Sequence, residues 1–210
     1  LNELDACHVF GALGVTSAQT AVIKTPDEAV NIGYPVVAKI LSPDIAHKTD
    51  AGGVILNIAD AAALQQAART ILRTVGNKHP GAQINGILVQ RMEKGLAEII
   101  LGFKRDPQVG PVVVLGVGGV LAEIYKDFAS RLAPVNVEDA AAMIEQVKGL
   151  AVIRGYRGLP KGDCAALAQT VSAFSQLAYI DSITEAEINP LIVKKAGDGV
   201  VAVDGLVVQR

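Results

Sequence analysis

The chain has 210 residues, of which 50% are hydrophobic and 19% charged, and its formal net charge is -2. A chain of this length can bury a core without a disulfide or a metal, as one large domain or two small lobes. The absence of a basic excess and of Trp argues against nucleic-acid binding. The longest apolar stretch, 112–122, is interrupted by glycines and is too short to span a membrane. Two cysteines, no CxxC pattern and no secretory signal predict a cytoplasmic protein without a zinc site.

The first half alternates between helical and strand patterns. Apolar residues at helical spacing predict an N-terminal helix over 4–13. Thr25, followed by Pro26 and Glu28, forms a capping box that predicts a short helix to about Gly33. The other predicted elements are strands over 34–41, 54–58 and 84–92 and a long helix, capped by Asp60, that ends near Gly76.

The second half continues this alternation. Its predicted elements are strands over 97–103, 111–115, 121–125 and 130–134, a turn over 105–108, helices from Asn136 to about 147 and from Asp163 to about 179, and a hairpin that pairs 184–194 with 200–209. The pattern predicts an α+β or α/β protein with two lobes and a boundary near 90–94. We expect residues 1–92 to form the N-terminal helix and the first lobe, and residues 93–210 to form the second.

A glycine pair and a buried lysine are candidates for phosphate binding. Lys39 is the one charge in an apolar strand, where an ammonium needs a phosphate, a carboxylate or access to water. Gly52-Gly53 ends a polar loop before a strand, and glycine lets backbone N–H groups approach phosphate oxygens. The same pair is also typical of an ordinary hairpin turn.

A second glycine-rich segment follows the strand over 111–115. Gly116, Gly118 and Gly119 resemble a dinucleotide fingerprint, but Leu121 stands where its third glycine belongs. We therefore expect Gly118 and Gly119 to belong to a second loop that closes on a nucleotide.

The tripeptide Glu187-Ile188-Asn189 is a candidate metal site. In a strand, Glu187 and Asn189 point to one face and Ile188 to the other. Asp204 lies on the next predicted strand and can share that face, and oxygen ligands of this kind suit Mg²⁺. The alternative is a solvated strand face.

His47 is the one histidine in the polar loop before Gly52-Gly53. A neutral imidazole nitrogen is a nucleophile near pH 7 and can form a covalent intermediate. His8 and His79 are expected to be structural or surface residues.

Six ordered segments, VVAKI, SPDIAHKTDAGGV, LGVGGVLAEIYKD, SRLAPV, RGYRG and EINPLIV, resemble the ATP-grasp domain of NDP-forming acyl-CoA synthetases. The resemblance covers nearly the whole chain. It implies an ATP-grasp fold of two α+β lobes and the reaction of ATP, a small carboxylic acid and CoA to ADP, phosphate and acyl-CoA through an acyl phosphate and a phosphohistidine.

The resemblance also implies roles for individual residues. Lys39, Gly52 and Gly53 would contact ATP phosphates, and the adenine would lie against the hinge from Gln90 to Met92. Asn189 and Asp204 would hold Mg²⁺, with Glu187 beside the metal or orienting the phosphohistidine. His47 would relay the phosphoryl group. Three further residues would lie near the nucleotide: Glu98, Glu123 and Arg131.

The family also carries a CoA-binding domain and a ligase domain with its own phosphorylated histidine, and nothing in this chain resembles either. The chain therefore resembles a β subunit, or one domain of a fused chain, that needs an α-subunit-like partner. Two alternatives stay open: a regulatory ATP-grasp module of a fused protein acetyltransferase, and another ATP-grasp carboxylate ligase.

Overall fold

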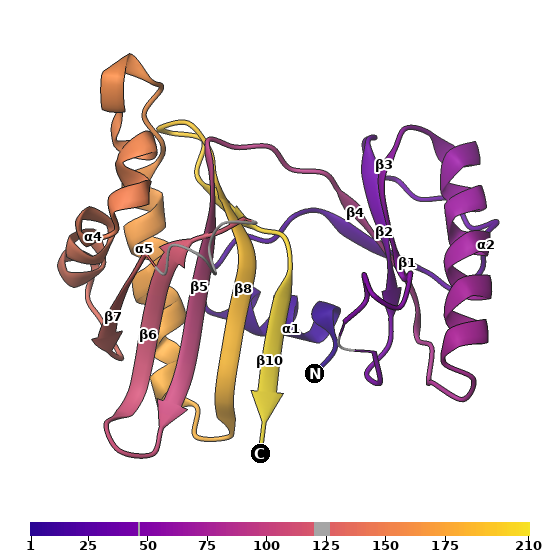
Figure 1. Cartoon of the computed structure of the whole chain (residues 1–210), viewed down its shortest axis with the longest axis horizontal. Helices are drawn as coiled ribbons and strands as arrows, with labels where there is room; N and C mark the ends of the chain where they lie inside the picture. Colours follow the sequence, from indigo (N-terminus) through magenta and orange to yellow (C-terminus); the bar gives the residue numbers. More distant parts are fainter. Residues whose placement is uncertain (46, 120–126) are drawn as a thin grey trace. The chain divides into compact units, whose positions relative to one another are not determined.

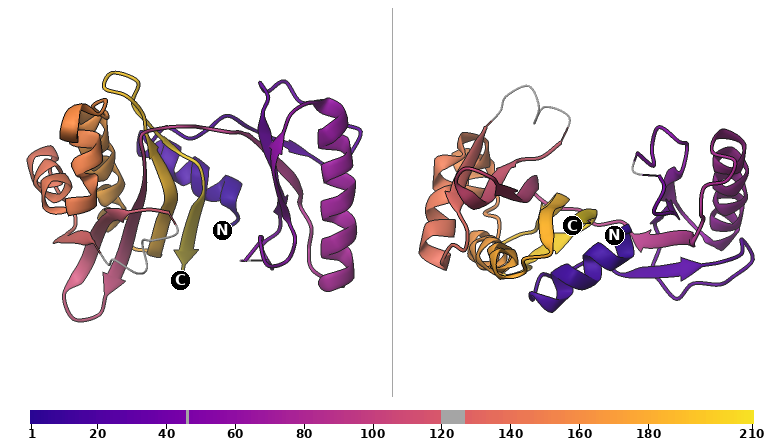
Figure 2. Two further views of the ribbon diagram at one scale, coloured as in Figure 1. Left: turned by 45° about the horizontal axis from the view of Figure 1, so that its top comes forward. Right: turned by 90° about the horizontal axis from the view of Figure 1, so that it is seen from below.

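The computed structural model describes residues 1–45, 47–119 and 127–210 and divides the chain into two compact units (Figures 1 and 2). Unit 2 comprises Asn2 and Ala18–Met92, and unit 1 comprises Leu1, Glu3–Ser17 and Glu93–Arg210. The chain passes from unit 1 to unit 2 after Ser17 and returns after Met92. Helix α1 (Glu3–Ala12), which we had grouped with the first lobe, falls instead in unit 1, because its Ala6 and Phe10 belong to that core.

Unit 2 is a four-stranded antiparallel sheet covered on one face by a helix. Its elements are β1 (Thr20–Ile23), β2 (Val36–Leu41), β3 (Val54–Ile58), α2 (Ala61–Lys78) and β4 (Gly86–Arg91), with strand order β1-β4-β2-β3. Alternate residues of β2, namely Val36, Ala38 and Ile40, join the core with the apolar stripe of α2. Figure 1 shows α2 running along this face of the sheet.

Unit 1 is a six-stranded antiparallel sheet, also covered on one face. Besides α1, its elements are β5 (Ala97–Asp106), β6 (Gly110–Val117), β7 (Phe128–Leu132), α4 (Val137–Gln146), η1 (Lys148–Arg154), η2 (Tyr156–Gly158), α5 (Cys164–Ser175), η3 (Gln176–Tyr179), β8 (Ile183–Val193), β9 (Val200–Ala202) and β10 (Gly205–Gln209). The strand order is β10-β8-β5-β6-β7, with β9 paired to β8. The predicted mixed α+β fold is confirmed.

The helices of unit 1 bury one face of this sheet and leave the other outside the core. Inward side chains of β5, such as Leu101 and Phe103, pack with residues of α4 and α5, such as Met143 and Phe174. Because strand residues alternate between faces, Glu98 and Lys104 of β5 lie on the opposite face. We call this the open face of unit 1.

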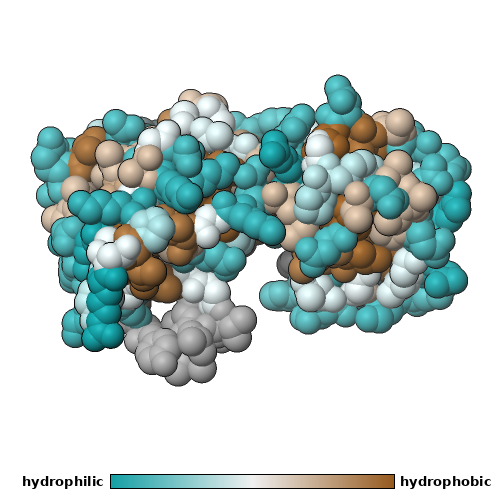
Figure 3. All heavy atoms as spheres, turned by 90° about the horizontal axis from the view of Figure 1, so that it is seen from above, coloured by the Kyte–Doolittle hydropathy of each residue, from teal (hydrophilic) through white to brown (hydrophobic). Residues whose placement is uncertain are grey.

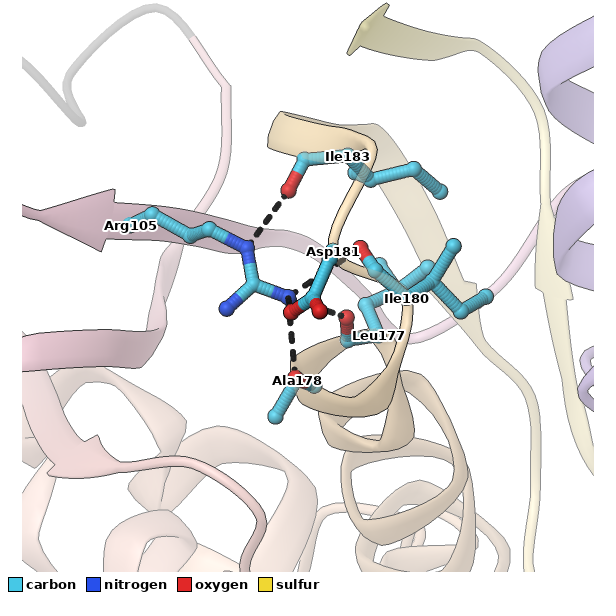
Figure 4. Close-up of polar contacts among 6 residues, drawn as sticks. All are labelled: Arg105, Leu177, Ala178, Ile180, Asp181 and Ile183. Atoms are coloured by element: carbon cyan, nitrogen blue, oxygen red, sulfur yellow. Dashed lines mark hydrogen bonds and ion pairs between the residues drawn. The ribbon is translucent and has the colours of Figure 1, made fainter. Parts of the chain in front are cut away.

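Arg105 on β5 fixes the connection from α5 to β8 (Figure 4). Its Nη2 donates to the carbonyl of Ala178 at 2.8 Å, and its Nε donates to the carbonyl of Ile183 at 2.8 Å. The carbonyls of Leu177 and Ile180 accept from the same Nη2. These four carbonyls end a helix and begin β8, so a single guanidinium satisfies groups that the helix end leaves without partners.

One predicted helix is wrong. Glu28 Oε1 accepts a hydrogen bond from the Thr25 N–H at 2.9 Å, which is one half of a capping box, but the Thr25 hydroxyl donates to the same carboxylate at 3.1 Å and no helix begins there. The next residues include Ile32, which is buried in the core of unit 2, and Gly33, a poor helix former. Core burial therefore overrides the local helix signal.

Other differences are smaller. Strand β1 was not predicted, and the last predicted strand, 200–209, is divided into β9 and β10. The predicted strand at 121–125 lies outside the described residues. Within the described ranges, no helix combines the length and the apolar character that a membrane crossing needs.

Candidate functional site

The predicted site residues fall into one set in each unit. In unit 2, Lys39 and Gln90 lie on the face of the sheet opposite α2. Gln90 of β4 pairs directly with Val37 of β2, and Lys39 pairs with Leu88 of β4. Directly paired residues share a face, so these four side chains form an apolar wall with two polar groups. That composition is typical of a small-molecule site.

Gln90 is the most unusual residue of this wall. Its side chain is 0% exposed, and neither Oε1 nor Nε2 has a hydrogen-bond partner within the described residues. A buried carboxamide without partners costs about 1–3 kcal/mol for each unsatisfied group. The position of this amide therefore favours a polar ligand at the predicted hinge. Met92 is the last residue of that hinge, and its Sδ accepts from the Asn57 N–H at 3.3 Å.

The loop between β2 and β3 carries His47, which is exposed. The His47 carbonyl accepts from the Ala51 N–H at 3.2 Å, so the backbone turns back on itself directly after the histidine. The imidazole is thus presented by a short, internally bonded turn rather than by a helix or a strand.

Gly52 and Gly53 shape this turn. The Gly52 N–H donates to the Thr49 carbonyl at 2.9 Å, and the Gly53 N–H donates to the Lys48 carbonyl at 2.8 Å. Both groups that we expected to face phosphate are therefore engaged within the loop in this structure. The glycines have local reasons instead: Gly52 has a φ of 72°, and a Cβ on Gly53 would lie 2.4 Å from Ile40 Cγ2.

In unit 1, Glu187 and Asn189 lie together on the open face. Asn189 Nδ2 donates to Glu187 Oε1 at 3.0 Å, while Ile188 between them is buried in the core. Asp204 precedes β10 directly opposite Asn189, whose N–H donates to the Asp204 carbonyl at 3.1 Å. The predicted geometry of this set is therefore present.

A β-bulge aims these side chains. Between the pairs Ile99–Leu191 and Leu101–Ile188, strand β8 has one more residue than β5. The extra residue falls at Asn189-Pro190, and bulges of this kind redirect side chains next to functional sites. The carboxamide of Asn189 therefore projects from the sheet at the point where the register between β5 and β8 shifts.

The donor set is suited to a hard cation that keeps other ligands. Glu187 and Asp204 provide carboxylate oxygens and Asn189 a carboxamide oxygen. Among the residues that the structure describes, no group of three or more His, Cys, Asp or Glu side chains could hold a metal ion. This set fits Mg²⁺, which usually takes one or two protein ligands together with phosphate and water, better than a metal held entirely by protein.

Glu98 at the start of β5 lies on the open face beside the second glycine loop. The Gly118 N–H donates to the Glu98 carbonyl at 2.7 Å, and a Cβ on Gly119 would lie 3.8 Å from Glu98 Oε2. A pocket of about 420 Å³ opens here, lined by residues 93–98 and Ile192. These three predicted residues therefore lie together.

Glu93, which lines this pocket, forms an ion pair that sequence reasoning missed. Lys194 Nζ lies 2.8 Å from Glu93 Oε2, and both side chains are largely buried. The two residues are far apart in sequence, and only the pairing of β5 with β8 brings them together. The one sequence feature that indicated this ion pair was the charged dipeptide Glu93-Lys94 directly after the hinge.

Arg131 does not lie on the open face with Glu98 and Glu187. Arg131 of β7 pairs with Val113, a core residue of β6, so it shares the helix-covered face at the sheet edge rather than the open face. Its Nη1 donates to the Ser130 carbonyl at 2.8 Å. Glu123 lies outside the described residues.

Comparison with known proteins extends these observations to the whole chain. Residues 1–208 match a family model described as an ATP-grasp domain. The chain is 39% identical over 209 residues to the β subunit of ADP-forming acetate–CoA ligase I of Pyrococcus furiosus, covering 97% of this chain and 89% of that subunit. It is 40% identical over 198 residues to ADP-forming acetate–CoA ligase I of Archaeoglobus fulgidus, covering 92% of this chain but only 29% of that longer protein.

Solved structures agree. The dinucleotide-forming acetyl-coenzyme A synthetase 1 of Ca. Korarchaeum cryptofilum, in complex with coenzyme A, Ca-AMPCP and HgCl⁺, matches with a TM-score of 0.92 and 35% identity, covering 100% of this chain and 93% of that one. A second structure of that enzyme, with coenzyme A and Mg-AMPPCP and with its phosphohistidine segment pointing towards the nucleotide site, matches with a TM-score of 0.84 and 31% identity, covering 99% and 92%.

Proposed function

This chain belongs to the ATP-grasp domain family of the ADP-forming acyl-CoA synthetases, and we propose that it binds ATP with Mg²⁺ and transfers the γ-phosphoryl group during acyl-CoA synthesis. The whole reaction converts ATP, a small carboxylic acid and CoA to ADP, phosphate and acyl-CoA. The observation that carries the proposal is the joint placement of Glu187, Asn189 and Asp204 at a bulge on the open face of unit 1.

His47 is the proposed phosphoryl acceptor. A neutral imidazole nitrogen attacks the γ-phosphorus, a P–N bond forms, and the bond from the γ-phosphorus to the bridging oxygen breaks. ADP leaves with the electron pair, and the imidazole proton passes to water. In support, His47 is exposed on a short turn and is thus accessible to a phosphate.

Each unit, taken by itself, carries groups suited to the charges of this step. Lys39, 6% exposed on its sheet face, would neutralise phosphate oxygens. Asn189 and Asp204 would hold Mg²⁺, which supplies further neutralisation of the phosphate charge when bound. Glu187 accepts from Asn189 Nδ2, so it leaves Asn189 Oδ1 directed away and available as a ligand.

The rest of the reaction needs a partner. The carboxylate would take the phosphoryl group from the phosphohistidine to give an acyl phosphate, and the CoA thiol would then displace phosphate. We propose that a CoA-binding and ligase partner performs these steps, because the chain spans 29% of the longer Archaeoglobus relative and 89% of the Pyrococcus β subunit.

The experiment is incubation with γ-labelled ATP and Mg²⁺, with and without the CoA-binding partner. We expect acid-labile label on this chain that is lost in His47→Ala, while nucleotide binding persists. His79→Ala, another exposed histidine of unit 2, serves as the matched control and should keep its label. Bound ATP with no label in any arm would contradict the relay and favour a regulatory module.

A further inference from the structure

One matched segment has no place in the proposed nucleotide site. The RGYRG block, Arg154–Gly158, lies in unit 1 and consists of the last residue of η1, Gly155 and the three residues of η2. Together with Leu159 we call it the RGYRG loop. It contains none of the residues that we place on the open face of unit 1 or in the two glycine loops. Its backbone conformation, exposed side chains and charge indicate a role other than nucleotide binding.

The backbone of the loop is strained at one residue. Gly155, Arg157 and Gly158 have φ values of 87°, 53° and 79°. Glycine adopts this left-handed region without penalty, whereas another residue costs about 1–2 kcal/mol. The chain thus has glycine at two of three left-handed positions and arginine at the third. Arginine at that position implies a use for its side chain.

The side chains of the loop form an exposed cluster suited to protein recognition. Tyr156 is 54% exposed and Leu159 50% exposed, and the Arg157 guanidinium lies 5.2 Å from the centre of the Tyr156 ring. Tyrosine and arginine are the residues that most often dominate binding energy at interfaces. The loop lies at the top of unit 1 in Figure 1, and Figure 3, which looks down on that end, shows hydrophobic patches within a hydrophilic surface.

The base of the loop is held rigidly. Ile153 is fully buried, and its carbonyl accepts from the Gly162 N–H at 2.8 Å. The Lys161 carbonyl accepts from the Ala196 N–H at 2.9 Å, which joins the loop to the hairpin after β8. A preformed loop loses little conformational entropy when it binds.

The charge of the segment is of one sign. Residues 148–162 contain Lys148, Arg154, Arg157 and Lys161 and no Asp or Glu. Arg154 is partly neutralised, because its Nε lies 3.3 Å from Glu145 Oε2. Arg157 and Lys161 remain exposed, so a partner with carboxylates beside an apolar patch would be complementary.

We infer that the RGYRG loop is a docking surface for the CoA-binding and ligase part of the enzyme, through an acidic and apolar patch on that part. The inference rests on the proposed function in requiring such a partner. In the Archaeoglobus relative most of the protein lies outside the matched segment, so a domain similar to this one is there joined to a larger remainder.

The test measures binding of this chain to its own CoA-binding subunit by titration calorimetry at low and high salt. We expect Arg157→Gly to weaken binding about tenfold and to reduce its salt dependence, and Tyr156→Ala to weaken it similarly. Arg157→Gly keeps the left-handed backbone available, so thermal unfolding should stay unchanged or improve. Matched controls are Tyr179→Ala, 73% exposed in the same unit, and Arg73→Ala on α2.

Parent-like binding by both loop variants, or no binding by the parent chain, would overturn the inference. Sedimentation of the chain alone forms a separate arm: if Arg157→Gly abolishes a self-association, the loop joins two copies of this chain instead. ADP titration in parallel distinguishes the two proposals. Retained ADP binding in Arg157→Gly with lost partner binding supports docking, while failure of the parent chain to bind ADP contradicts the proposed function and leaves the docking result interpretable.

Discussion

Asn189 Nδ2 donates a hydrogen bond of 3.0 Å to Glu187 Oε1 across one buried residue of β8. The bond fixes which end of the carboxamide faces the open side of the sheet, because only the NH₂ group can donate. Glu187 therefore positions Asn189, in addition to the role beside the metal that we propose for it.

Replacement of Glu187 should expose this role. In Glu187→Gln, the new NH₂ group competes with the carboxylate geometry that orients Asn189, so we expect Mg²⁺-dependent nucleotide affinity to fall about 10- to 100-fold. We expect Asn189→Ala to lower this affinity by a similar factor. Calorimetry with a non-hydrolysable ATP analogue, with Mg²⁺ and with EDTA, measures the difference. Glu185→Gln, on the same face of β8 opposite Lys104, should bind as the parent does.

Lys39 offers a second test, on unit 2. Lys39→Met keeps the length and the apolar stem of the side chain and removes the charge, so the fold should persist. Loss of the charged hydrogen bonds to phosphate should lower the affinity for ATP about tenfold to a hundredfold. AMP, which lacks the distal phosphates, should be affected less. Lys104→Met, exposed on β5, is the matched control, and equal losses for ATP and AMP would contradict a phosphate contact.

Gly53 separates packing from ligand binding. A Cβ at this position would lie 2.4 Å from Ile40 Cγ2 and 3.1 Å from the Lys48 carbonyl oxygen, so Gly53→Ala should destabilise by about 1–3 kcal/mol through overpacking. Gly76→Ala, inside α2 with nothing near the new methyl group, should stabilise by about 0.5–1 kcal/mol. Urea unfolding measures both. If the Gly53→Ala protein were as stable as the parent but failed to bind ATP, the result would support direct contact between the Gly53 backbone and phosphate.

Arg105 is predicted to matter for stability rather than for binding. Arg105→Met leaves the carbonyls of Ala178 and Ile183 without their donor in a half-buried setting, which should cost about 2 kcal/mol. The midpoint temperature of thermal unfolding should fall accordingly. Arg73→Met, on the exposed surface of α2, should change stability by less than about 0.5 kcal/mol. A parent-like unfolding midpoint for Arg105→Met would show that water replaces the guanidinium.

The helix boundaries were predictable from sequence where the signal is local. Asp60, Asn136 and Asp163 each cap a helix with their side chains, as expected, because the hydrogen bond joins residues three apart. At Thr25 and Glu28 only one of the two capping-box bonds forms and no helix follows, because Ile32 is buried in the core of unit 2 instead. Local chemistry thus predicts a cap, whereas the conformation of the next residues depends on the core.

Long-range pairing was not predictable. The bulge at Asn189-Pro190 depends on how many residues β5 offers opposite β8, and the face of Arg131 depends on its register with Val113. The close approach of Gly53 to Ile40 likewise joins two strands. Sequence predicted that Glu187 and Asn189 share a face because alternation is local, whereas the face of Arg131 is set by its pairing with a neighbouring strand.

Asp163 connects the start of α5 to the hairpin between β8 and β9. Its Oδ1 accepts from the Ala166 N–H at 3.0 Å, and its Oδ2 accepts from the N–H groups of Gly197 and Gly199 at 2.9 and 3.0 Å. The Ala166 bond is the largest cause that lowers the pKa of this carboxyl, followed by the Gly199 and Gly197 bonds, while desolvation opposes them. The carboxylate is therefore favoured in the folded state.

The pH dependence of stability can be derived from this direction. Because the pKa of Asp163 is lower in the folded than in the unfolded chain, its contribution to stability is present above the unfolded value, near 4, and is lost as the pH falls through the folded value. Asp163→Ala should destabilise by about 1 kcal/mol at pH 7, as expected for loss of an N-cap, and by less at pH 3. Urea unfolding at both pH values measures the difference, with Asp198→Ala at the exposed hairpin tip as the control. A loss that is equal at the two pH values would mean that Asp163 acts through packing and not through its charge.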